Sequence, residues 1–158
     1  MSGRLVAIFT APSAGEPLVA RATCRAIAGE GLEGDRYAAK RGTFSRREGR
    51  GRQVTLIARE AIAVANDAGV VLEAHEPRRN LVTEGVDLGR LVGMTFTVGE
   101  AVLIGVRDCL PCAYLEGLTR PGVRAALEGR GGLRADVVRD GIVRVGDEIA
   151  VVDRNSTE

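Results

Sequence analysis

Two cysteines three residues apart are the clearest candidates for chemistry in this sequence. Cys109 and Cys112 follow an apolar run with strand character and lead into the short segment AYLEGL. A thiol at the start of a helix and close to arginines ionises more readily to the thiolate, which is the nucleophilic and metal-binding form. Arg107 and Arg120 lie on either side of the pair. The spacing therefore suits disulfide exchange, metal ligation or transport of sulfur as a persulfide.

The rest of the sequence bears on these three uses of the cysteine pair but does not decide between them. Disulfide exchange in the thioredoxin manner expects a βαβ unit, which the pattern does not indicate. A tetrahedral zinc site needs four ligands, and Cys24, His75, Cys109 and Cys112 make just four, with no second cysteine pair. A buried cysteine can also serve as a small apolar side chain. Metal ligation, sulfur transport and simple packing all stay open.

A second polar cluster precedes an apolar strand. Arg78, Arg79 and Asn80 run directly into the segment LVT. Arginines bind phosphate or carboxylate oxygens with two parallel hydrogen bonds, and an asparagine offers both a donor and an acceptor. The alternative is an ordinary exposed loop whose arginines pair with Glu76 and Glu84.

Two glycine-rich stretches could bring the main chain close to a ligand. GEGLEG at 29–34 matches the dinucleotide-binding pattern, but the segment after it has no apolar helical face, so we exclude that function. GRGGLR at 129–134 could let N–H groups approach a ligand, or could be a flexible loop after a helix.

The segment from Arg36 to Arg52 is strongly basic, with a single acid, Glu48. Its basic residues are Arg36, Lys40, Arg41, Arg46, Arg47, Arg50 and Arg52. A loop of this length within a compact domain is usually functional or disordered. It therefore predicts either a lid that closes over an anion or a solvated loop.

The amino-acid composition limits the kinds of molecule that this protein can bind. The 158 residues carry a net charge of +1, no Trp, two Tyr and three Phe, which argues against nucleic acid as the main partner. Lys40 is the one lysine, so no internal pyridoxal phosphate is expected. No apolar run is long enough for a signal sequence or a membrane span. Three cysteines are too few for a disulfide framework, so we expect a cytoplasmic protein that does not act at a membrane.

The elements that position these residues are mostly short strands separated by glycine turns. The expected strands are Arg4–Thr10, Leu18–Ile27, Gln53–Ile57, Asn80–Val82, Thr95–Val98, Ala101–Arg107, Ala135–Arg139 and Glu148–Val152. Helices are expected at Arg59–Ala68 and Pro121–Glu128. The pattern favours a β-barrel or sandwich. We expect a single domain over residues 1–152 and a polar tail at 153–158.

Seven segments, taken in order, resemble the MOSC domain, a family named after the C-terminal domain of molybdenum-cofactor sulfurases. They are GLEGDR at 31–36, RQVTLI at 52–57, RRNLVTEG at 78–85, LVGMTFTVGEAVL at 91–103, LPC at 110–112, GGLRADVV at 131–138 and VGDEI at 145–149. The resemblance runs from about Arg4 to Val152. It implies a mainly β fold, a partly open barrel like the barrel domain of pyruvate kinase, with a few short helices.

The resemblance also implies a molybdenum cofactor and one cysteine that ligates molybdenum or carries sulfur. That cysteine is Cys112, whereas Cys109 is not a reliable position of the family. The implied cofactor-binding positions are Asp35, Arg36, Arg78, Asn80, Gly132, Leu133 and Arg134. A thiolate suits thiophilic molybdenum, and arginine and asparagine suit the phosphate and ring edges of the pterin.

Three functions are compatible with the resemblance. The first is reduction of a small N-hydroxylated or N-oxide substrate, with electrons from a separate flavin or iron–sulfur partner. The second is a sulfur carrier that uses a Cys112 persulfide, or a cofactor-delivery module, working with a separate cysteine desulfurase. A binding domain without chemistry is the third. The family's reductases use an additional N-terminal barrel to complete the cofactor pocket, so we expect a homo-oligomer or a docked partner to complete it here.

Overall fold

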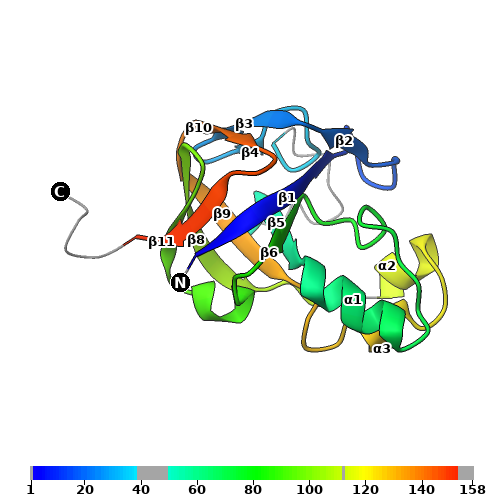
Figure 1. Cartoon of the computed structure of the whole chain (residues 1–158). Coiled ribbons are helices and arrows are strands. Elements are labelled where there is room, and N and C mark those ends of the chain that lie inside the picture. Colours follow the sequence, from blue (N-terminus) through cyan, green and yellow to red (C-terminus); the bar gives the residue numbers. More distant parts are fainter. Residues whose placement is uncertain (1, 39–49, 112, 153–158) are drawn as a thin grey trace.

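The computed structural model describes residues 2–38, 50–111 and 113–152, and it shows a β-barrel with its α-helices gathered on one side (Figure 1). The strands are β1 Ser2–Thr10, β2 Val19–Arg21, β3 Thr23–Ile27, β4 Gly31–Leu32, β5 Val54–Ala58, β6 Leu81–Glu84, β7 Thr95–Val98, β8 Ala101–Asp108, β9 Leu133–Arg139, β10 Gly141–Arg144 and β11 Glu148–Val151. The helices are α1 Arg59–Asp67, α2 Ala113–Leu118 and α3 Val123–Ala126, with a 3-10 helix, η1, at Leu88–Leu91.

Seven strands form a closed ring in the order β11-β7-β8-β9-β5-β6-β1, because β1 also pairs with β11. β1 is nine residues long and makes this closure possible: its first residues pair with β11, its middle with β6 and its last residues with β2. β5 and β6 are parallel and are connected through α1, whereas the other described pairs of the ring are antiparallel. A small sheet, β10-β3-β4, lies over one end of the barrel (Figure 1).

The barrel interior is filled by side chains that alternate along each strand. In β8 the residues at every second position from Ala101 to Gly105 are buried, as a strand with one face toward a core requires. Leu5, Leu56, Phe96, Leu103 and Leu133 are all at most 1% exposed and form one apolar cluster. Burying a side chain of this size stabilises the fold by about 2 kcal/mol. The interior is therefore a packed core and not a ligand channel.

A second apolar cluster lies outside the barrel, between its wall and the helices. α1 contributes Ala61, Ile62 and Ala65, which share one helical face and pack toward Ile57 and Val82 of the strands. β5 is therefore buried on both faces, which explains why its sequence VTLIA is apolar without alternation.

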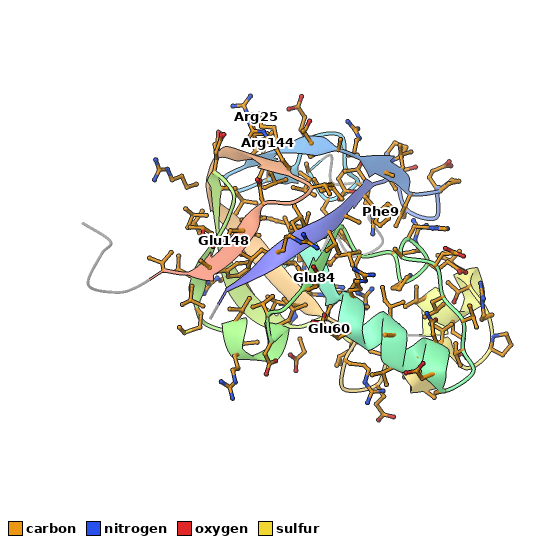
Figure 2. The ribbon with its side chains drawn as sticks, viewed as in Figure 1. Phe9, Arg25, Glu60, Glu84, Arg144 and Glu148 are labelled. Carbon is orange, nitrogen blue, oxygen red and sulfur yellow. The ribbon has the colours of Figure 1, made fainter. Side chains whose placement is uncertain are left out.

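The small sheet carries exposed ion pairs. Arg25 and Arg144 lie close to each other at this end of the molecule (Figure 2). Arg25 lies 3.4 Å from Asp140, and Arg144 lies 2.8 Å from Glu100. The hydrogen bond from Arg144 lowers the pKa of Glu100. Exposed pairs of this kind add little to stability. This end of the molecule is therefore solvated, in contrast to the end that carries the helices.

The prediction of a mainly β barrel with a few short helices is confirmed, and the barrel is closed where a partly open one was expected. The segment expected as a single strand at Leu18–Ile27 is two strands, β2 and β3, which belong to different sheets. Four short elements were not predicted: β4, β10, α2 and the 3-10 helix η1. Each has two to six residues, too few for a periodic pattern to stand out.

Within the described residues, no helix is long and apolar enough to cross a membrane.

Candidate functional site

Asp35 and Arg36 form a buried ion pair that closes the turn after β4. Arg36 donates to Asp35 Oδ1 over 3.1 Å, and the two side chains are 6% and 0% exposed. Asp35 also accepts the main-chain N–H groups of Ala11 and Tyr37, at 3.0 and 3.3 Å. The guanidinium of Arg36 lies 4.5 Å from the ring centre of Tyr37. The carboxylate is thus used to hold the chain together, and Arg36 is fixed by it.

Arg36 reaches the second cluster through the main chain of Arg78. One of its N–H groups donates to the carbonyl oxygen of Arg78 over 3.1 Å. Arg78 has φ +60°, and no other non-glycine residue of the described chain has a positive φ. This left-handed conformation costs roughly 1–2 kcal/mol for a residue with a Cβ atom. Because the neighbouring contacts impose it, it marks a position where geometry is held against local preference, which is frequent at functional sites.

Asn80 is fully buried, and both polar atoms of its side chain form hydrogen bonds within the protein. Its Oδ1 atom accepts from the N–H and the hydroxyl of Thr55, at 3.0 and 3.1 Å, and its Nδ2 donates to the carbonyl of Phe9. These bonds tie the start of β6 to β5 and β1. Asn80 therefore fixes the strands from which Arg78 and Arg79 extend.

Arg79 is the residue that links this cluster to the cysteine segment. It is 8% exposed, and its guanidinium donates to the carbonyls of Gly131 at 2.9 Å, Pro77 at 3.2 Å, and Cys109 and Leu110 at 3.4 Å. A buried guanidinium bound only to carbonyl groups holds three loops in a fixed relation. The sequence offered a signal for it, a second arginine within RRN, but not its partners.

The glycine loop packs directly against the same segment. A Cβ atom on Gly131 would lie 2.4 Å from the carbonyl oxygen of Cys109, and one on Gly132 would lie 2.0 Å from that of Leu56. The Cys109 N–H donates to the Gly132 carbonyl over 2.8 Å. Two backbones approach this closely only where side chains are absent. Leu133, by contrast, points into the barrel core and is 0% exposed, so only its main chain could meet a ligand.

Arg134 lies beside this cluster, because it is the strand partner of Thr55. It is also paired with Arg107 across β8 and β9. Arg134 and Arg107 donate to the carbonyls of Gly51 and Arg50, at 3.4 and 2.7 Å. We call the set of Arg36, Arg50, Arg78, Arg107 and Arg134 the basic face. Its carboxylates are Asp35 and Asp136, and Asp136 is engaged by the Gly51 N–H at 2.9 Å.

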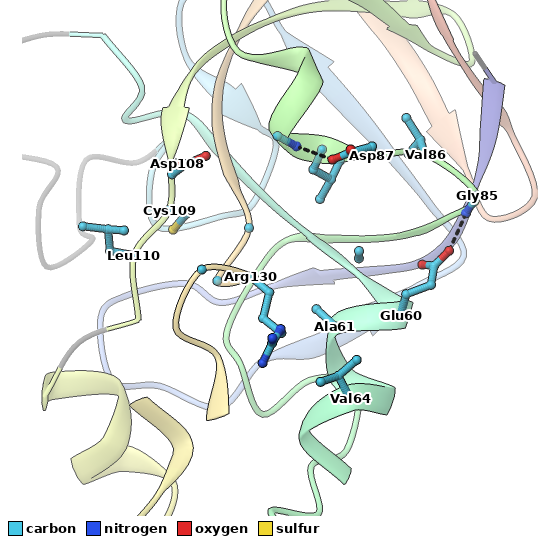
Figure 3. A pocket seen from close by; sticks show the side chains of 16 residues that line it. Glu60, Ala61, Val64, Gly85, Val86, Asp87, Asp108, Cys109, Leu110 and Arg130 are labelled. Atoms are coloured by element: carbon cyan, nitrogen blue, oxygen red, sulfur yellow. Dashed lines mark hydrogen bonds between the residues drawn. The ribbon is translucent and has the colours of Figure 1, made fainter. Parts of the chain in front are cut away.

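A pocket of about 630 Å³ opens on the other side of the glycine loop, between α1, η1 and the end of β8 (Figure 3). Its walls are apolar side chains and five glycines, and its charged residues are Glu60, Asp87, Asp108 and Arg130. Cys109 also lines it while remaining 1% exposed as a residue. We call this cavity the barrel-end pocket.

The structure therefore joins Asp35, Arg36 and the main chain of Arg78 through direct contacts. Asn80 bonds instead to Thr55 and Phe9, and Arg134 is the strand partner of Thr55. Cys112, the cysteine predicted to be the metal ligand, lies outside the described residues, as do Lys40, Arg41, Arg46 and Arg47 of the basic segment. The prediction of a lid in that segment consequently stays a prediction.

The four-ligand zinc alternative is not supported by the described part of the chain. Cys24 lies in the barrel core, where burial raises the pKa of its thiol. His75 is exposed and packs edge-on against Phe9, with ring centres 6.2 Å apart. Among the described residues, no three His, Cys, Asp or Glu side chains gather closely enough to hold a metal ion.

Comparisons with solved structures identify proteins of the same fold. YuaD from Bacillus subtilis aligns over 96% of each chain with a TM-score of 0.78 and 20% identity. YiiM from Geobacillus stearothermophilus aligns over 98% of this chain and 77% of its own, with a TM-score of 0.74 and 15% identity. YiiM from Escherichia coli aligns over 98% and 71%, with a TM-score of 0.66 and 20% identity. A comparison with curated protein sequences gave no match.

A family model for the MOSC domain matches residues 43–150, which is more than half of the chain. That span contains the RRN cluster, the cysteine pair and the glycine loop. The structure brings Cys109 and the glycine loop into contact with Arg79. This chain belongs to the MOSC domain family.

Proposed function

We propose that this protein binds the molybdenum cofactor and reduces a small N-hydroxylated or N-oxide substrate, with Cys112 as the protein ligand of the metal. Membership of the MOSC family connects the chain with molybdenum-cofactor chemistry in general terms. The specific reaction and the ligand are our proposal. The observation that carries it is the basic face: Arg36 donates to the carbonyl of Arg78, which has a left-handed backbone conformation. The next residue, Arg79, binds the carbonyl of Leu110 in the segment before Cys112.

The charge of the basic face fits an anionic group. Its five arginines exceed the two carboxylates among them, and both carboxylates are already held by internal hydrogen bonds. Guanidinium groups match phosphate oxygens in geometry as well as in charge. Arg36, Arg78 and Arg134 are the residues we expect to hold the phosphate of the pterin. Asp35 and Asn80 act in this proposal by fixing those arginines, since their own side chains bond within the protein.

The backbone before Cys112 is held firmly, as a metal ligand requires. Arg79 binds the carbonyls of Cys109 and Leu110, and the Cys109 N–H is bound by Gly132. Ligands held by such outer contacts keep their orientation when the metal changes its other partners. In this proposal these contacts fix residues 109 and 110, which precede Cys112 in the sequence.

The cofactor, when bound, supplies a redox-active molybdenum centre that the chain itself lacks. Reduction of an N-hydroxylated compound consumes two electrons and two protons, breaks the N–O bond and releases water. We assign the electrons to a separate flavin or iron–sulfur protein. The protein's own part is to hold the cofactor by its phosphate and its metal, and to leave the substrate an approach. A second copy of the chain or a docked partner would complete the pocket.

Native mass spectrometry of protein purified from a molybdate-fed host tests the proposal. We expect an adduct with the mass of the pterin plus molybdenum, lost in Cys112→Ala and retained in the matched control Cys109→Ala. Arg134→Gln should reduce occupancy without removing the metal ligand. A protein without any such adduct, in the presence of a cell extract that supplies cofactor, would contradict the proposal.

The same measurement separates the sulfur-carrier alternative. An adduct of one additional sulfur on Cys112, with no pterin, would contradict the reductase function. It would indicate a carrier that receives sulfur from a cysteine desulfurase. Loss of that sulfur under a reducing thiol would identify it as a persulfide.

A further inference from the structure

The segment between α1 and β6, residues 68–80, passes beside α2 on its way back to the barrel (Figure 1). It contains two successive turns. In the first, the Glu76 N–H donates to the carbonyl of Glu73 at 3.0 Å. In the second, the Arg78 N–H donates to the carbonyl of His75 at 3.0 Å. Arg78, with φ +60°, thus takes its left-handed conformation at the end of the second turn, so whatever holds these turns also decides where Arg78 lies.

One ion pair fastens the first turn to the helices. Both carboxylate oxygens of Glu76 are used: Oε1 accepts the Glu73 N–H at 2.9 Å, and Oε2 accepts from the guanidinium of Arg120. Arg120 lies in the turn between α2 and α3, and its other terminal nitrogen donates to the carbonyl of Val71. The side chain of Glu76 is 16% exposed, so its carboxylate is more shielded from solvent than those of the ion pairs on the small sheet.

Apolar packing supports the same connection. Leu72 is buried and belongs to one cluster with Leu115 of α2. Glu116, also on α2, accepts the N–H groups of Gly122 and Arg124 at 3.1 Å each, which ties α2 to the start of α3. The two short helices, the turn between them and the segment around Leu72 therefore form one packed unit.

The ion pair lies between the two ends of the predicted cofactor site. Arg78 follows Glu76 by two residues, and its carbonyl is bound by Arg36 of the basic face at 3.1 Å. Arg120 belongs to the unit whose first helix, α2, begins directly after Cys112 in the sequence. Neither Glu76 nor Arg120 belongs to the basic face or lines the barrel-end pocket. A role of this pair in the site must therefore act through other residues.

We propose that Glu76 and Arg120 are positioning residues for Arg78: their ion pair holds the turn that imposes the left-handed conformation, and with it the direction of the Arg78 side chain. A residue with a Cβ atom keeps this conformation only where the surrounding structure fixes it. Arg36 fixes the carbonyl of Arg78, and the ion pair fixes the turn before it. The consequence for cofactor binding rests on the proposed function, whereas the coupling to Arg78 does not.

A double-mutant cycle on the protein without cofactor tests the coupling, with urea unfolding as the measurement. With the ion pair intact, the folding equilibrium constant of Arg78→Gly should exceed that of Arg78→Ala roughly fivefold, because only glycine adopts φ +60° without cost. In the background of Glu76→Gln the turn can relax, and this ratio should fall below about twofold. Arg120→Gln should cause the same fall, since it breaks the pair from the other side.

Glu100→Gln is the matched control, because it breaks the ion pair with Arg144 on the small sheet. In that background the ratio of the glycine to the alanine variant should stay at roughly fivefold. A contribution of the Glu76 pair to stability alone would lower both Arg78 variants by the same factor and leave the ratio unchanged. An equally large ratio in Glu76→Gln and Glu100→Gln would therefore overturn the proposal.

Cofactor occupancy, measured by native mass spectrometry at limiting cofactor, tests the consequence for binding. Glu76→Gln should lower occupancy roughly threefold, although Glu76 is not a cofactor ligand in the proposed function. The exchange of Glu76→Arg with Arg120→Glu should restore part of it, because the attraction returns while the hydrogen bond to Val71 is lost. Glu100→Gln should have no effect. Wild-type occupancy in Glu76→Gln would overturn the role in binding.

The two measurements separate this inference from the proposed function. A wild-type protein that binds no cofactor would contradict the reductase function, and the cycle would still decide whether the ion pair acts on Arg78. Conversely, an additive cycle in a protein that binds the cofactor would overturn only the positioning role.

Discussion

The basic face and the barrel-end pocket lie on opposite sides of the same pair of strands. Arg107 and Arg134 are partners across β8 and β9, and the next pair along is Asp108 with Leu133. Successive side chains of a strand point to opposite faces. Arg107 therefore belongs to the positive side, while Asp108, its neighbour in sequence, lines the negative pocket.

The two regions are also built differently. The basic face is held by side chains that bond to main-chain carbonyls, and it includes one residue in a strained conformation. The pocket has apolar walls with carboxylates oriented by main-chain N–H groups. The strand ladder lets one short sequence, VRDC, supply charges of opposite sign to two sites without neutralising either. What both sites share is the wall of Cys109, Leu110, Gly131 and Gly132, with Arg79 bound to it.

The largest effect is expected from a change in the basic face alone. Arg36→Met leaves the buried carboxylate of Asp35 without its cation, which should lower the free energy of unfolding by about 3 kcal/mol. Urea denaturation measures it. The double variant Asp35→Asn with Arg36→Met should recover part of the loss, because asparagine can still accept the Ala11 N–H without a charge. An unfolding free energy within 0.5 kcal/mol of the wild type, roughly the spread of neutral surface changes, would contradict the account of the pair.

A change in the shared wall should lower both stability and cofactor binding. Arg79→Met leaves the carbonyls of Pro77, Cys109, Leu110 and Gly131 without their donor, with an expected loss of roughly 2 kcal/mol. Arg79→Lys should restore part of the stability, since an ammonium has three donors but not the planar geometry. Measured at a temperature where the variant is folded, cofactor occupancy should fall in Arg79→Met. Unchanged occupancy would show that the cofactor site does not depend on this wall.

The smallest effect isolates the strain at Arg78. Both Arg78→Gly and Arg78→Ala remove the guanidinium, but only glycine adopts φ +60° without cost. The glycine variant should be more stable than the alanine variant by about 1 kcal/mol in thermal or urea unfolding, and both should lose cofactor to the same extent. A more stable alanine variant would mean that the left-handed conformation is not retained.

Much of the fold followed from local pattern. The strands at Thr95–Val98 and Ala101–Asp108 agree closely with the prediction, because alternation along a half-buried strand and a glycine turn between two strands are local properties. α1 was also predicted, since Ala61, Ile62 and Ala65 already mark an apolar face at helical spacing. The closure of β1 on β11 was not, because it joins residues at the two ends of the chain, and pairing between distant strands leaves no local mark.

For the candidate site, too, some features followed from the sequence and others only from the tertiary structure. The sequence by itself determined which residue types are present: the cysteine pair, the RRN cluster, the Gly-Asp-Arg segment and the glycine loop, and their order indicated the family. Only the tertiary structure decided their roles. It turned the side chains of Asp35 and Asn80 inward as supports, made Arg79 the link between three loops, and placed Arg107 and Asp108 on opposite sides of one ladder. The physical reason is that a hydrogen-bond partner is set by proximity in space. Apart from Pro77, Arg36 and Tyr37, which lie one or two residues away, all of these partners lie far away along the chain.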